Sequence, residues 1–406
     1  MNTSKKTRQE IPLKQLKPGM YVIEIIRTSS DIKIKSEGYI VHTSTLDKLA
    51  QAGINRVIVD PSREKKTDKI DRILPVESKK TQTKKKTSEK KIPLDEEMNK
   101  AKTLYNDAKL LQEKILTNIT QGKVINVSEV KNSTDSMVES IFRNQDALSC
   151  MSRLRFKDKY LIEHSLNVSI LMSIFAKHLN IDKKIIEQLA LGAFLHDIGK
   201  TLVADHILNK QGRFTPDEYE QMKEHVNLGI KVLEQTPDIS AIALSIVQQH
   251  HERLDGSGYP KQSQADDISQ YGRMIAIVDS YDAMTADREY KKGIHPIKAF
   301  KILLYEAESG YDESLVEQFI QCIGVYPVGT LVKLNSGKLG LISQLNKSRP
   351  LRPFVRVFYS TRLNQAIAME EIDLSQSKHK DQIDHCIKPE DFKLDLVKFF
   401  QQAFWN

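Results

Sequence analysis

The segment Leu191-Gly-Ala-Phe-Leu-His-Asp-Ile-Gly-Lys200 decides the fold of this chain. It is an apolar helical stretch that ends in a histidine, an aspartate, a glycine and a lysine. Neighbouring residues on a helix point about 100° apart, so the imidazole of His196 can bind one cation while the carboxylate of Asp197 reaches a second. Taken by itself, such a pair is more often a hydrogen-bonded core pair, because buried polar groups normally find partners.

Four more histidines and a second aspartate occupy comparable positions. Leu161, His164 and Val168 share a helical face at positions i, i+3 and i+7. Alone, a histidine of this kind is more often a satisfied core side chain than a ligand. The set is more specific than its parts, because five histidines and two aspartates on separate apolar helices fall within 116 residues. Its members are His164, His196, Asp197, His225, His250, His251 and Asp279.

This set of side chains predicts a metal site. Buried carboxylates without a cation would be costly. Imidazole and carboxylate ligands without thiolate suit iron, manganese or zinc. The three cysteines, Cys150, Cys322 and Cys386, are far apart and form no CxxC pair, which argues against a disulfide framework and a thiolate site. We expect two divalent metal ions, iron or manganese, with zinc as a further option.

Composition narrows the class of protein. The chain has 406 residues, a net charge of +8 and a pI near 9.0. Much of the positive excess lies in one run between Lys79 and Lys91, which is typical of a solvated linker. Because no aromatic residues interleave with that run, we expect no nucleic-acid polymer as a partner. No apolar run approaches the roughly 20 residues of a membrane span, and the first residues lack the apolar core of a signal peptide, so we expect a cytoplasmic protein.

The pattern along the chain predicts a mainly α protein in which a helical central domain is flanked by two small units. The N-terminal unit is α/β, with strands at 20–26 and 57–59 and a helix at 44–52. A hairpin with the turn Asn335-Ser-Gly and a strand at 354–359 make the C-terminal unit rich in β-structure. The expected parts are 1–61 (α/β), 62–94 (Lys-rich linker), 95–134 (connecting amphipathic helix), 135–325 (central domain) and 326–406 (β-rich, with a terminal helix at 392–404).

Several motifs together resemble the HD-GYP subgroup of the HD phosphohydrolases. They are His196-Asp-Ile-Gly-Lys200, Ile207-Leu-Asn-Lys with Gly212, His250-His-Glu-Arg-Leu-Asp-Gly-Ser-Gly-Tyr-Pro260, and Asp279-Ser-Tyr-Asp-Ala-Met-Thr-Ala-Asp-Arg-Glu-Tyr290. The resemblance spans about 150–325. The N-terminal unit resembles, more loosely, the small domain that often precedes HD-GYP in bacterial proteins. The resemblance makes all seven residues of the set metal ligands.

The resemblance also implies an activity, the hydrolysis of cyclic di-GMP to linear pGpG and onward to GMP. Asp197 would bridge the metals, and Lys200 would contact a phosphate oxygen. Arg288 and Lys291 would hold the second phosphate or a guanine edge, and Tyr259 would shape the substrate pocket beside the glycine-rich rim. Some relatives have a glutamate one turn before the first ligand that helps to hold a third metal. Tyr160 stands there, so we expect a binuclear site, with Glu163 or water as open substitutes.

Two other functions stay open at this point. One is a phosphodiesterase for another cyclic dinucleotide such as cyclic GMP-AMP. The other is a non-catalytic sensor of cyclic dinucleotides that signals through its flanking units. Those units could regulate access, recruit a diguanylate cyclase or an adaptor protein, or build a homodimer.

Overall fold

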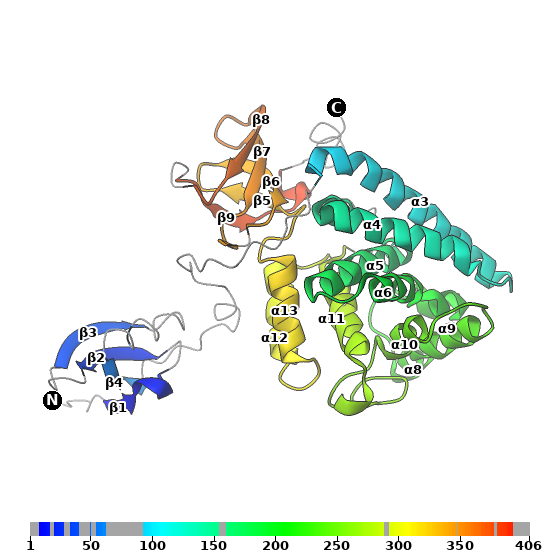
Figure 1. Cartoon of the computed structure of the whole chain (residues 1–406), viewed down its shortest axis with the longest axis horizontal. Helices are drawn as coiled ribbons and strands as arrows, with labels where there is room; N and C mark the ends of the chain where they lie inside the picture. The colour runs from blue at the N-terminus through cyan, green and yellow to red at the C-terminus, as the bar shows by residue number, and fades with distance from the viewer. Residues whose placement is uncertain are drawn as a thin grey trace. The chain divides into compact units, whose positions relative to one another are not determined.

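The computed structural model describes residues 8–16, 20–27, 33–39, 49, 54–61, 92–153, 160–287, 292–346, 348–376 and 380–392. The chain divides into two compact units, Met1–Gln82 and Thr83–Asn406 (Figure 1). Four predictions lie outside the described residues: the linker at 62–91, the helix at 44–52 apart from Leu49, Arg288 with Lys291, and the terminal helix beyond Phe392. In the described part of the chain, no helix has both the length and the apolar content needed to cross a bilayer.

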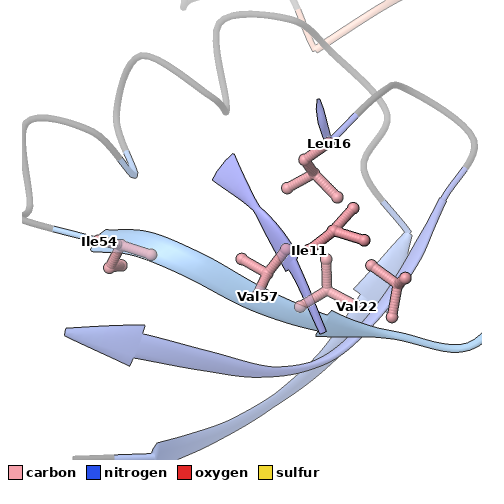
Figure 2. Close-up of a cluster of buried hydrophobic side chains, with 6 residues drawn as sticks. Ile11, Leu16, Val22, Ile54 and Val57 are labelled. Atoms are coloured by element: carbon pink, nitrogen blue, oxygen red, sulfur yellow. The ribbon is translucent and has the colours of Figure 1, made fainter. Parts of the chain in front are cut away.

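The N-terminal unit is an antiparallel sheet with the strand order β1-β4-β2-β3. Apolar side chains from three strands and from Leu16 form its core, which Figure 2 shows. The predicted strands at 20–26 and 57–59 correspond to β2 and β4 and are confirmed. The elements are β1 (Gln9–Pro12), η1 (Leu13–Gln15), β2 (Tyr21–Arg27), β3 (Lys33–Tyr39) and β4 (Ile54–Val59).

Two long helices, α3 (Leu94–Thr120) and α4 (Val127–Met151), open the second unit and pack against each other. α3 buries the predicted apolar stripe, including Met98, Tyr105 and Ile115. Just after it, Gly122 has a φ of +70°, a left-handed conformation that favours glycine. α4 runs without interruption through residue 134, so the border that the sequence places there falls inside a helix.

The helical domain continues with shorter elements whose apolar faces meet in one core. Side chains at the helix starts cap several of them. For example, Ser240 and Ser269 each accept a backbone hydrogen bond three residues on. The prediction of a mainly α protein with a helical central domain is confirmed. The elements are α5 (Tyr160–His178), α6 (Lys183–Leu195), η4 (Ile198–Leu202), α7 (Asp205–Leu208), α8 (Pro216–Lys223), α9 (His225–Glu234), α10 (Ala241–Gln249), η5 (Ala265–Asp267), α11 (Gln270–Thr285), α12 (Pro296–Glu306) and α13 (Glu313–Ile323).

A five-stranded antiparallel sheet with the order β8-β7-β6-β5-β9 forms the C-terminal part. The predicted hairpin is β5 and β6, and Gly337 in its turn has a φ of +85°. The sheet contacts the helical domain, since Arg356 donates to Asp95 in α3 at 2.8 Å. The strands are β5 (Leu331–Leu334), β6 (Lys338–Gln344), β7 (Phe354–Ser360), β8 (Gln365–Asp373) and β9 (Ile383–Cys386), and η6 (Pro389–Phe392) follows.

Candidate metal centre

The seven side chains that the sequence singles out come together in the helical domain. They belong to five segments that pack around one point, and most sit where a helix begins or ends. His164 lies in α5 and Asp279 in α11, whereas His225 is the first residue of α9. His196 and Asp197 follow α6, and His250 and His251 follow α10. Six of the seven are almost completely buried, and only the side chain of His251 reaches 19% exposure.

The carboxylate of Asp197 lies at the centre of the group and faces two sets of histidines. Its Oδ1 is 3.4 Å from Nε2 of His225 and 3.7 Å from Nε2 of His250. Its Oδ2 is 3.5 Å from Nε2 of His164 and 3.4 Å from Nε2 of His196. One carboxylate therefore belongs to two half-sites, and each half-site offers ligand atoms within 4.8 Å of one another.

A second carboxylate, that of Asp279 in α11, lies close to three of the histidines. Its Oδ1 is 2.9 Å from Nε2 of His164 and 3.7 Å from Nε2 of His196. Its Oδ2 is 3.8 Å from Nδ1 of His251. Asp279 thus lies near members of both half-sites, on the side where the cluster is least buried.

Backbone carbonyl groups at the helix ends bind one nitrogen of three imidazoles, so the other nitrogen points to the centre of the cluster. In His196, His225 and His250, Nδ1 donates to the backbone carbonyl three residues earlier, at 2.7, 2.7 and 2.8 Å. His164 uses a side chain instead, because its Nδ1 lies 2.8 Å from Oδ2 of Asp282. With Nδ1 protonated and engaged, Nε2 presents a lone pair, which is the form that binds metal.

Two buried polar atoms in this cluster lack a hydrogen bond. Within the described residues, Nε2 of His196 and Oδ1 of Asp197 are fully enclosed and have no hydrogen-bond partner. Buried polar atoms nearly always have a hydrogen-bond partner. Two such atoms that face one centre without a partner therefore indicate a bound group that accepts lone pairs. The donor set contains only nitrogen and oxygen, which fits divalent transition metals. The residues present therefore fit a metal ion, and the cluster could hold one in each half-site.

The pKa values of the cluster point the same way. Burial lowers the pKa of His225 to about 4 and that of His250 to about 3, so both stay neutral at physiological pH. Burial alone would raise the pKa of Asp197, but Lys200 and His196 hold it well below its usual value. The pKa of His196 is raised, against the effect of burial, by Asp197 and Asp279. Against the effect of burial, the pKa of Asp279 is also held well below its usual value, by His164 and His196, so two ionised carboxylates lie in a closed space that favours a cation.

Lys200 and the glycine-rich rim complete the surroundings. Nζ of Lys200 is 2.5 Å from Oδ2 of Asp197, and its side chain is 20% exposed. The rim folds back on the histidines, since the backbone N–H of Tyr259 donates to the carbonyl of His251 and the two rings stack with centroids 4.5 Å apart. A Cβ on Gly258 would lie 2.5 Å from the same carbonyl, so only glycine fits this approach.

Comparison with known proteins finds a family model that matches each of three ranges of the chain. The family model of the HD domain matches residues 148–315, a domain of unknown function (DUF3391) matches 8–130, and the KOW domain associated with HD domain matches 331–395. A cyclic di-GMP phosphodiesterase of Pseudomonas aeruginosa is 31% identical over 382 residues, which are 92% of this chain and 91% of that protein. The chain belongs to the HD-GYP family.

Other relatives match over shorter stretches. A cyclic di-GMP phosphodiesterase of Thermotoga maritima is 33% identical over 184 residues, 45% of this chain and 49% of that protein. A phosphodiesterase of Vibrio cholerae named as specific for 3′3′-cGAMP is 36% identical over 128 residues, 31% of this chain and 24% of that protein. Relatives named for either substrate are therefore similar to part of this chain.

Sequence reasoning missed two carboxylates that support the HD-GYP centre. Asp282 orients His164, and a signal was present, because Asp279 and Asp282 are three residues apart on one face of a buried helix. Glu252, only 2% exposed, accepts from the backbone N–H groups of Lys261 and Ser263 at 2.8 and 3.0 Å and so holds the rim. A charged residue in a turn usually lies in solvent, so nothing in the sequence marked Glu252 as buried.

Glu163, one of the open substitutes for the glutamate that Tyr160 replaces, already has a partner in the structure. Glu163, which precedes the first histidine of this HD-GYP centre, is 2% exposed and pairs with Lys109 of α3 at 2.5 Å. Its carboxylate thus already has a cationic partner from another helix.

Proposed function

We propose that this protein is a metal-dependent phosphodiesterase that hydrolyses cyclic di-GMP to linear pGpG, with two divalent cations held by the clustered histidines and aspartates. The observation that carries the proposal is Asp197, which directs one carboxylate oxygen to each half-site. The named activity of the Pseudomonas aeruginosa relative, which matches nearly the whole chain, supports the substrate. Hydrolysis of pGpG to GMP would be a second reaction at the same centre.

We assign the ligands to two sets that share Asp197. His164, His196 and Asp279 would hold one cation, and Asp279 lies within 2.9 Å of His164. His225, His250 and His251 would hold the other. Iron or manganese fits this donor set, and zinc is the alternative.

When bound, the cations would neutralise charge on the phosphodiester and lower the pKa of water to near 7. The chain supplies the positioning. Asp197 aligns the two half-sites, and the ammonium of Lys200, partly exposed beside it, would contact a non-bridging phosphate oxygen. Tyr259 would shape the pocket next to His251. Arg288 and Lys291, which follow α11 in the sequence, would bind the second phosphate or a guanine edge.

The test combines metal analysis with product analysis. Protein purified without oxygen should contain two metals per chain and convert cyclic di-GMP to pGpG, measured by HPLC. Replacing His196 and Asp197 together by alanine should abolish turnover and lower the metal content while the chain stays folded by circular dichroism. Full activity of this double variant would refute the assigned centre. Tight binding of cyclic di-GMP without any product would instead favour a sensor.

A second substrate is favoured by the Vibrio cholerae relatives named as specific for 3′3′-cGAMP. The ratio of kcat/KM for cyclic di-GMP and 3′3′-cGAMP, measured on the same preparation, decides between the two. We expect the ratio to favour cyclic di-GMP. A diguanylate cyclase, an adaptor protein or a second copy of the chain are the partners proposed for the flanking units.

A further inference from the structure

Among the described residues of the candidate centre, His251 and Lys200 have the most exposed side chains. The side chains of His164, His196, Asp197, His225 and His250 are at most 2% exposed. His251 is 19% exposed and Lys200 is 20% exposed. We therefore expect a substrate that brings a phosphate to this centre to approach along His251 and Lys200.

On that side, a series of rings leads away from the centre. The ring of Tyr259 stacks on His251 at 4.5 Å with an interplanar angle of 29°. The ring of Tyr219, in α8, meets Tyr259 edge to face at 6.4 Å and 80°. Tyr219 is 47% exposed, whereas Tyr259 is partly buried. A large aromatic ring thus stands open to solvent two ring contacts from a proposed metal ligand.

A positive charge lies over the same rings. Nζ of Lys223 is 5.3 Å from the ring centroid of Tyr219 and 5.8 Å from that of Tyr259. It pairs with Glu220 at 2.6 Å, and the lysine side chain is 22% exposed. Lys223 lies one turn after Tyr219 on the same short helix, so both side chains project from one face.

The helix that carries these two residues is fixed at its start. Thr215 and Glu218 form a capping box, in which each side chain accepts a backbone N–H of the other residue, and Pro216 begins the helix. Glu218 also pairs with Lys210. An exposed ring on a helix with a fixed start loses little entropy when a ligand stacks on it.

We propose that Tyr219 is a stacking platform for one purine base of the cyclic dinucleotide, and that Lys223 contacts an acceptor on that base or on its phosphate. The inference deepens the proposed function and depends on it. A cyclic dinucleotide holds one phosphate at the reaction centre and carries its bases outward, where the exposed ring stands. Stacking suits any base, whereas a lysine ammonium favours the O6 and N7 acceptors of guanine.

The experiment measures KM and kcat for cyclic di-GMP in Tyr219→Ala, Tyr219→Phe and Tyr219→Leu. Loss of one stacked base should raise KM about 5- to 150-fold in the alanine and leucine variants. Because the contact exists equally in the ground state and the transition state, kcat should change less than about twofold. The phenylalanine variant keeps the ring and should behave as the wild type. Lys223→Met should also raise KM with kcat preserved.

The matched control is Tyr305→Ala, which removes a tyrosine that is 74% exposed on α12, away from the ring series. It should leave KM and kcat unchanged. An unchanged KM in Tyr219→Ala overturns the inference, and so does a phenylalanine variant as impaired as the alanine one, or a loss confined to kcat. If the circular dichroism spectrum of Tyr219→Ala shows that this variant is unfolded, the KM values of Tyr219→Leu and Tyr219→Phe test the inference instead. Equal KM values in these two variants would overturn it. If the wild-type protein forms no product from cyclic di-GMP, the proposed function is wrong. That outcome differs from a changed KM pattern, which concerns only the stacking inference.

Discussion

Replacing Gly199 by alanine tests how closely the metal centre depends on the approach of two backbones. A Cβ at this position would lie 1.9 Å from the carbonyl oxygen of His225 and 2.5 Å from the amide nitrogen of Gly229. Ordinary contact begins at 3.4 Å, and the interior is close-packed, so η4 and α9 would have to separate by about 1.5 Å.

That separation acts directly on the proposed ligands. Asp197 stands just before η4, and His225 is the first residue of α9, with 3.4 Å between the carboxylate and the imidazole. A misplacement of about 1 Å can cost about 100-fold in rate, and overpacking of a core costs about 1–3 kcal/mol. We therefore expect Gly199→Ala to lower kcat/KM at least about 100-fold, and to lower the metal content and the melting temperature.

The control is Gly310→Ala in the same domain. A Cβ on Gly310 would have its nearest neighbour at 3.5 Å, which is an ordinary contact, so stability and activity should stay near the wild-type values. The assays are HPLC of the products, metal analysis by mass spectrometry and thermal unfolding by circular dichroism. A Gly199→Ala protein with wild-type kcat/KM and two metals per chain would show that the close approach does not set the ligand geometry.

Three further predictions follow from single contacts. Asp282→Asn removes the charge that orients His164, so we expect metal affinity to fall about 10- to 100-fold, measured by competition with a chelator; unchanged affinity would contradict this role. Lys200→Met should lower kcat about 100-fold or more while the metal content stays the same, and wild-type kcat would remove this lysine from the mechanism. Lys109→Met removes the ion pair that Lys109 makes with the buried Glu163 and should cost about 3 kcal/mol in urea unfolding. Lys114→Met, which breaks an exposed pair on the same helix, should cost less than about 1 kcal/mol, and equal losses would disprove the distinction.

The fold class was predictable because the patterns that define it are local. The apolar stripe on α3, the hairpin of β5 and β6, and the strand β2 each depend on side-chain spacing within a few residues. The border at residue 134 was not predictable in the same way. Both sides of it are helical, and the pattern does not show that one helix, α4, runs through it.

The candidate ligands were predictable as a set, because five histidines and two aspartates on apolar segments within 116 residues are far more specific than any one of them. Their division into half-sites was not. It depends on Asp197, whose two oxygens face different histidines, and on helix ends that turn each Nε2 inward. Glu252 shows the same limit, because its burial depends on a rim that folds back over it.

The sequence by itself predicted which residues are candidate metal ligands and that they lie on or next to helices. Only the tertiary structure decided which of them face the same half-site, which carboxylate orients His164, and which exposed ring lies near the cluster. The physical reason is distance along the chain. Helical periodicity acts over one or two turns, whereas His164 and Asp282 are 118 residues apart in sequence and 2.8 Å apart in space. Contacts of that kind arise from the packing of whole helices, which the local spacing of residues does not specify.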